Sequence, residues 1–217
     1  MKRQKINAFV SSAAVLAAIV TATPAFAGPP LLCHPFEIGT ARSLPWDGNW
    51  SQGKADYKIA NLIGDTEALL TPSTPVVVRM ETLRRAALYA SANAEIANQL
   101  LSRLLARADA SETAGRPDAL ALLDAAYVAE AFREIASLSG ADFAVRAEGA
   151  RATLGHADGY TLISRSISAR PDDPAIQFAA ALIAADKNRA RYTDHAAKAR
   201  AGAARDPLLA RNLYHVQ

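Results

Sequence analysis

The chain has very little cysteine: Cys33 is the only one among 217 residues. A single thiol cannot form a disulfide within the chain, so packing has to stabilise the fold. If the protein is exported, an unpaired cysteine could instead form a disulfide with another molecule. Such a bond through Cys33 would link two copies of the chain as a homodimer.

The chain also lacks a long hydrophobic run. Its apolar region at residues 8–20 has 13 residues, whereas a membrane-spanning helix needs about 20. Three basic residues lie just before it, within residues 2–5, and the small-residue pattern Ala-Phe-Ala of a cleavage site follows at 25–27. We therefore predict a signal peptide over residues 1–27, cut after Ala27. The protein would be periplasmic or secreted, without stable membrane insertion after cleavage.

A basic stripe is missing as well. The chain carries 24 Lys and Arg against 21 Asp and Glu, and the three excess positive charges lie in the predicted signal peptide. The other 190 residues are neutral overall and contain no run rich in Lys or Arg. Binding to nucleic acid or to an anionic membrane normally requires such a run, so we expect neither as a partner.

Catalytic and metal-binding motifs do not stand out. His156, His195 and His215 are scattered, without the His-x-x-x-His or Glu-x-x-His spacing that places two ligands on one helix face. The sequence therefore favours a protein that is not an enzyme, and it indicates no cofactor.

Runs of β-branched residues are few, while alanine makes up nearly a quarter of the chain. Intrinsic propensity thus favours helix almost throughout, and we predict an all-α fold. Residues 54–217 would form one domain of stacked antiparallel helical hairpins. Apolar residues recur at steps of three and four, which predicts helices at about 54–70, 75–90, 93–108, 118–138 and 188–203.

Two local features of helix 75–90 are also predicted. Thr74 followed by Pro75 is typical of a helix start, with Thr74 as the N-cap. Glu81 and Arg85 are four residues apart, so they are expected to form an ion pair on the solvent side of this helix.

Residues 28–53 hold the only cysteine and both tryptophans of the chain. They are rich in proline, glycine and large apolar residues and show no helical period, so we predict an extended apolar arm. Phe36, Leu44, Trp46 and Trp50 would then fill gaps between the helices. The arm also resembles the N-terminal stretch of exported helical proteins of bacteria, a resemblance that implies no function.

Cys33 and His34 support an alternative interpretation. A thiolate beside an imidazole is suited to hold a soft metal ion or to form a reactive thiol site. Adjacent residues rarely bind one ion together unless the backbone turns, and no second cysteine is present. A thiol- or metal-dependent activity centred on Cys33 and His34 is therefore the second hypothesis.

The C-terminal third contains a repeated pattern. Asp173-Pro174 and Asp206-Pro207 are each typical of a helix start. They are 33 residues apart, close to the 34-residue period of a helix-turn-helix repeat. From about residue 158 the chain resembles a tetratricopeptide repeat, although the Trp and Gly-Tyr positions of that family are not reproduced. The resemblance implies an α-solenoid whose concave face binds a peptide or another protein.

We therefore expect a non-enzymatic, exported binding or scaffolding module with a protein or peptide partner. Candidates for the lining of its groove are Arg84, Tyr89, Tyr127 and Tyr192. A structural homodimer is a further hypothesis.

Overall fold

The computed structural model describes residues 28–155 and 157–217. The predicted signal peptide, its cleavage site and His156 lie outside the described residues. In the described ranges the chain forms nine α-helices and no β-strand, with one isolated bridge between Trp46 and Gly53. The all-α prediction is confirmed. None of the helices in these ranges is both long and apolar enough to cross a membrane.

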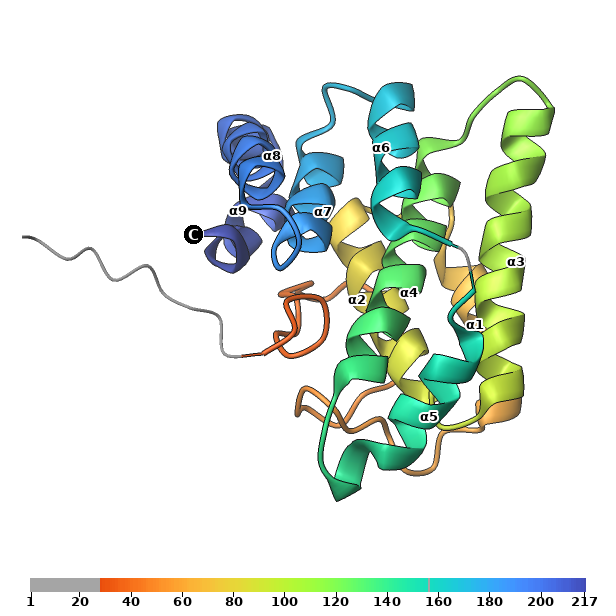
Figure 1. Cartoon of the computed structure of the whole chain (residues 1–217). Coiled ribbons are helices and arrows are strands. Elements are labelled where there is room, and N and C mark those ends of the chain that lie inside the picture. The colour runs from red at the N-terminus through yellow and green to blue at the C-terminus, as the bar shows by residue number, and fades with distance from the viewer. Residues whose placement is uncertain (1–27, 156) are drawn as a thin grey trace, which may run out of the picture.

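The helices follow one another with short connections (Figure 1). In chain order they are α1 (Leu62–Leu69), α2 (Val76–Ala90), α3 (Ala94–Thr113), α4 (Ala119–Ser137), α5 (Ala144–Thr153), α6 (Gly159–Ala169), α7 (Pro174–Ala184), α8 (Arg189–Gly202) and α9 (Pro207–Asn212). Four single turns of 3-10 helix complete the structure, at Ile59–Asn61, Ala141–Phe143, Ala203–Arg205 and Leu213–Val216.

Helices α2, α4 and α7 lie at the centre of the molecule. Helix α4 packs against α2, α3, α5, α6 and α7, and α7 packs in addition against α6, α8 and α2. Residues 175–184 of α7 are all buried, and five of these ten are alanine, whose small side chain permits close approach of neighbouring helices. One apolar core therefore joins helices that are far apart in the sequence. The stacked solenoid remains a prediction.

The Asp-Pro pairs begin helices, as predicted. Asp173 caps α7 by accepting hydrogen bonds from two backbone N–H groups of its first turn, and Asp206 caps α9 in the same way. Proline is the first residue of both helices, where its missing N–H costs no hydrogen bond.

Two predicted helix starts are wrong. Pro75, not Thr74, is the N-cap of α2, because the Thr74 hydroxyl instead donates to the Leu69 carbonyl (2.8 Å) and closes the loop after α1. The helix predicted from residue 54 begins only at Leu62, after a 3-10 turn. The reason is that Lys54 still belongs to the arm, where its backbone N–H donates to the Tyr89 hydroxyl (2.7 Å).

Candidate functional site

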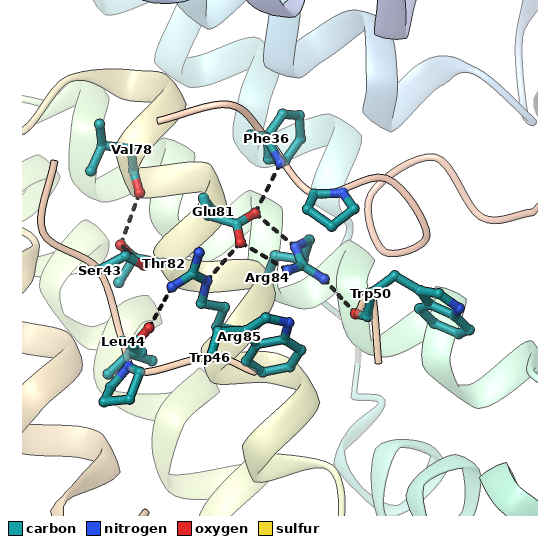
Figure 2. Close-up of polar contacts among 12 residues, drawn as sticks. Phe36, Ser43, Leu44, Trp46, Trp50, Val78, Glu81, Thr82, Arg84 and Arg85 are labelled. Carbon is teal, nitrogen blue, oxygen red and sulfur yellow. Dashed lines mark hydrogen bonds and ion pairs between the residues drawn. The ribbon is translucent and has the colours of Figure 1, made fainter. Parts of the chain in front are cut away.

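The arm was predicted over residues 28–53, and in the structure it continues to residue 58. It lies across helix α2 and covers a charged face of it (Figure 2). Glu81 and Arg84 have no exposed side-chain surface, and the Arg85 side chain is 18% exposed. The Glu81–Arg85 ion pair forms with a distance of 2.6 Å between Oε1 and Nε. Its predicted position on the solvent side is wrong, because the arm packs over this face.

Glu81 is the centre of the buried network under the arm. Its Oε2 accepts hydrogen bonds from Arg84 Nε (2.8 Å) and from the backbone N–H of Phe36 (3.1 Å). Its Oε1 accepts from Arg84 Nη2 (2.8 Å) and Arg85 Nε (2.6 Å). Burial acts to raise the pKa of Glu81, but the hydrogen bonds and charges of Arg84 and Arg85 prevail and hold the pKa below its usual value. The carboxylate is therefore ionised at neutral pH.

The two arginines of this network bind the arm through its backbone. Arg84 Nη1 donates to the carbonyls of Leu32 (3.2 Å) and Trp50 (2.6 Å), and Arg85 Nη1 donates to the carbonyl of Leu44 (2.5 Å). A segment with no helix or sheet needs such side-chain donors when its carbonyls are buried. The network thus replaces the hydrogen bonds that a regular element would supply.

The apolar side chains of the arm fill gaps in the body, as predicted. Phe36 and Leu44 are buried. Trp46 lies near the Arg84 guanidinium, whose carbon is 5.1 Å from the ring centroid, and Trp50 stacks on Phe143 with ring centroids 5.4 Å apart. The arm is an integral layer of the structure.

Three of the four predicted groove residues instead hold the arm in place. Arg84 binds its carbonyls, the Tyr89 hydroxyl donates to Pro45 (2.7 Å), and the Tyr127 hydroxyl donates to Leu31 (2.8 Å). Their predicted place in an open groove is therefore wrong. The fourth, Tyr192, is half-buried and donates to the carbonyl of the last residue (3.1 Å).

Cys33 and His34 lie where the arm meets the C-terminal end of the chain. Cys33 is half-buried, and burial followed by the nearby Glu134 raises the pKa of its thiol, which keeps it protonated at neutral pH. The His34 ring lies 6.1 Å from that of His215, whose pKa is lowered to about 4, mainly by burial. Among the residues that the structure describes, no group of three or more His, Cys, Asp or Glu is arranged to hold a metal ion.

Glu134 lies beside this part of the arm, and its carboxylate accepts the backbone N–H of Leu31 (3.0 Å). Burial raises the pKa of Glu134 well above its usual value, the hydrogen bond from Leu31 opposes this, and the charges of Glu130 and Asp186 add to the rise. The folded state therefore binds the proton of the Glu134 carboxyl more tightly than the unfolded state does. The stability that this tighter binding contributes is complete below the pKa of Glu134 in the unfolded chain. It is lost as the pH rises towards the pKa of Glu134 in the folded chain.

Glu134→Gln is accordingly expected to stabilise the protein at pH 7, by on the order of 1 kcal/mol. The amide oxygen still accepts the Leu31 N–H, while the cost of ionising the group is removed. Urea unfolding at pH 7 and pH 4 measures the effect, which should vanish at pH 4. Glu148→Gln, at an exposed glutamate of α5, is the control. A destabilised Glu134→Gln at pH 7 would show that the carboxylate charge supports the fold.

Hollows lie along the helices of the C-terminal third, and two of them have linings suited to binding. The first, which we call the α7/α8 hollow, has a volume of about 560 Å³ and lies at the start of α7 and the end of α8. Its lining includes Pro171, Asp172, Pro174, Lys198, Ala201 and Arg205.

The second, the α6/α8 hollow, has a volume of about 460 Å³ and lies where α6 and α8 begin and α7 ends. Its lining includes Arg133, Asp158, Tyr160, Lys187, Asn188 and Arg191.

A chain of hydrogen bonds connects the two hollows through the protein. The Tyr160 hydroxyl and His195 Nε2 are 3.0 Å apart, and His195 Nδ1 is 2.7 Å from Gln177 Oε1. Because an amide oxygen only accepts, Nδ1 carries the proton and Nε2 accepts from the tyrosine. Burial lowers the pKa of His195, which favours this neutral form. No sequence motif marks these three residues, which come from separate helices, α6, α7 and α8.

No protein-family model, no curated protein and no solved structure matches the chain.

Proposed function

We propose that the protein is an exported, non-enzymatic module that binds a protein or peptide through the tetratricopeptide-repeat-like hairpins of its C-terminal third. The α7/α8 hollow is the observation that carries this proposal. Helices α6, α7 and α8 are joined by short loops, and α7 packs against both others, as in consecutive antiparallel hairpins (Figure 1). The α7/α8 hollow lies at the protein surface, beside the start of α7 and the end of α8.

The lining of the α7/α8 hollow suits a polypeptide. Pro171 and Ala201 offer exposed apolar surface, while Asp172, Lys198 and Arg205 provide charges of both signs at exposed positions. Protein interfaces combine apolar contact with a polar rim in this way. The even charge balance of the chain after residue 27 supports a polypeptide partner over a polyanion.

A photo-crosslinking residue at Ala201, introduced into the full chain in its own cells, tests the proposal. We expect one discrete protein adduct, absent when the same residue replaces Val145, which is 67% exposed on α5. Lys198→Glu combined with Arg205→Glu should reduce the adduct by about tenfold or more. The melting temperature should fall only slightly, because the Lys198–Asp194 pair that is lost is exposed and contributes little. Equal adducts at both positions, or no effect of the double variant, would overturn it.

The alternative activity at Cys33 and His34 has weaker support. The thiol is held protonated, and the surrounding described residues do not complete a metal-ligand group. The second hypothesis therefore lacks the activated thiolate or the ligand set that its chemistry needs.

A further inference from the structure

We propose that the α6/α8 hollow is a binding site for the phosphate group of a small molecule, independent of the protein-binding surface proposed above. Arg133 from α4, Lys187 from the α7–α8 loop and Arg191 from α8 all line this hollow. Three cations from three elements thus converge on one concave surface of a chain that has no basic stripe.

Two of these three cations have an ion-pair partner among the described residues, and Arg191 does not. Glu130, with a nearly buried side chain, pairs with both Arg133 (2.7 Å) and Lys187, so one carboxylate serves two cations. Arg191 forms no ion pair within the described residues; its guanidinium carbon lies 4.1 Å from the Tyr160 ring centroid. A guanidinium that contacts a ring in this way and has no ion-pair partner among the described residues can still donate hydrogen bonds to an oxyanion.

Asp158, the other acid of the lining, already has partners. Its carboxylate accepts the Tyr160 N–H (2.9 Å) and the Thr161 hydroxyl (3.1 Å). Burial opposes ionisation, but these hydrogen bonds and the charge of Arg133 lower the pKa of Asp158. Asp186, next to Lys187 in the chain, is a further carboxylate near these cations. The cation that remains available to a ligand is therefore Arg191, for which the described residues supply no ion-pair partner.

The hydrogen-bond chain behind the hollow fixes its wall. His195 accepts from the Tyr160 hydroxyl and is itself oriented by Gln177, so the hydroxyl end of the ring that contacts Arg191 is held in place. A preorganised wall lowers the entropic cost of binding. A volume of about 460 Å³ exceeds what inorganic phosphate fills and matches a small phosphate monoester.

Isothermal titration of the purified protein with glucose 6-phosphate, inorganic phosphate and succinate tests the assignment. We expect the monoester to bind most tightly, inorganic phosphate more weakly and succinate least. Arg191→Gln should weaken binding by about tenfold or more. The melting temperature should fall only slightly, because an exposed cation–π contact such as that with Tyr160 contributes only about 0.5 to 1 kcal/mol.

Arg189→Gln is the matched control. Arg189 lies on the first turn of the same helix, but its guanidinium lies over Tyr192 and it does not line the hollow. This variant should bind within about twofold of the unmodified protein. Succinate binding as tightly as the monoester would overturn the phosphate assignment. Absence of binding by all three compounds at millimolar concentration, or an equal loss in both variants, would overturn the site itself. None of these three results would change the interpretation of the crosslinking at Ala201, so the two proposals can fail separately.

Discussion

Glu81→Gln is expected to lower the free energy of unfolding by about 3 to 5 kcal/mol, the cost of removing one partner of a buried ion pair. The variant keeps the shape of the side chain but leaves the fully buried Arg84 without its carboxylate. The same change weakens the attachment of the arm, since Glu81 also accepts the Phe36 N–H. Urea unfolding measures the stability, and limited proteolysis within residues 28–58 should become faster than in the unmodified protein.

Glu67→Gln is the control for this prediction. Glu67 pairs with Arg103 through two hydrogen bonds at the surface, and both side chains are well exposed. Exposed pairs contribute little, so a loss below about 1 kcal/mol is expected. If Glu67→Gln and Glu81→Gln cost the same, the network under the arm would not hold the structure together.

Asp124→Asn is the second variant with a large expected effect, again about 3 to 5 kcal/mol. Asp124 on α4 binds Arg79 of α2 through both carboxylate oxygens, and neither side chain is exposed. Arg79 also donates to the carbonyls of Leu70 (3.5 Å) and Thr71 (2.6 Å) after α1. One buried pair therefore joins three segments of the chain, and neutralising Asp124 leaves the guanidinium uncompensated.

Thermal and urea unfolding of Asp124→Asn beside Asp109→Asn check this expectation. Asp109 lies exposed on α3, so its variant should change stability by less than about 0.5 kcal/mol. A mild effect at Asp124 would mean that Arg79 finds other acceptors, and the predicted link between α2 and α4 would then be wrong.

Local patterns predicted most of the helices. Asn93 and Asp118 cap α3 and α4, and Asp173 and Asp206 cap α7 and α9, because a side-chain oxygen satisfies N–H groups that the helix itself leaves unbonded. Residues 141–153 are also helical, although their apolar residues follow the helical period only weakly. Tertiary packing explains the glycine at position 149, because a Cβ there would lie 2.2 Å from the Ser91 carbonyl oxygen.

The candidate sites were much less predictable. The arm was expected to pack on the body, yet the sequence did not show that Arg84 and Tyr127 would be buried beneath it. The spacing of apolar residues along a helix predicts that the polar residues between them face solvent. It carries no information about other segments that pack over the polar face. The α6/α8 hollow could not be predicted for the same reason, since Arg133, Lys187 and Arg191 come together only when α4, α7 and α8 have packed.

The sequence by itself determined the all-α class, the helix starts at Asp-Pro and the non-helical arm, because capping, propensity and periodicity act within a few residues. Only the tertiary structure decided that the arm covers the charged face of α2. It also decided that Glu81 and Asp124 are buried with their arginines, and that three cations line one hollow. These features depend on segments tens of residues apart, and their energies exist only once water has been excluded between them.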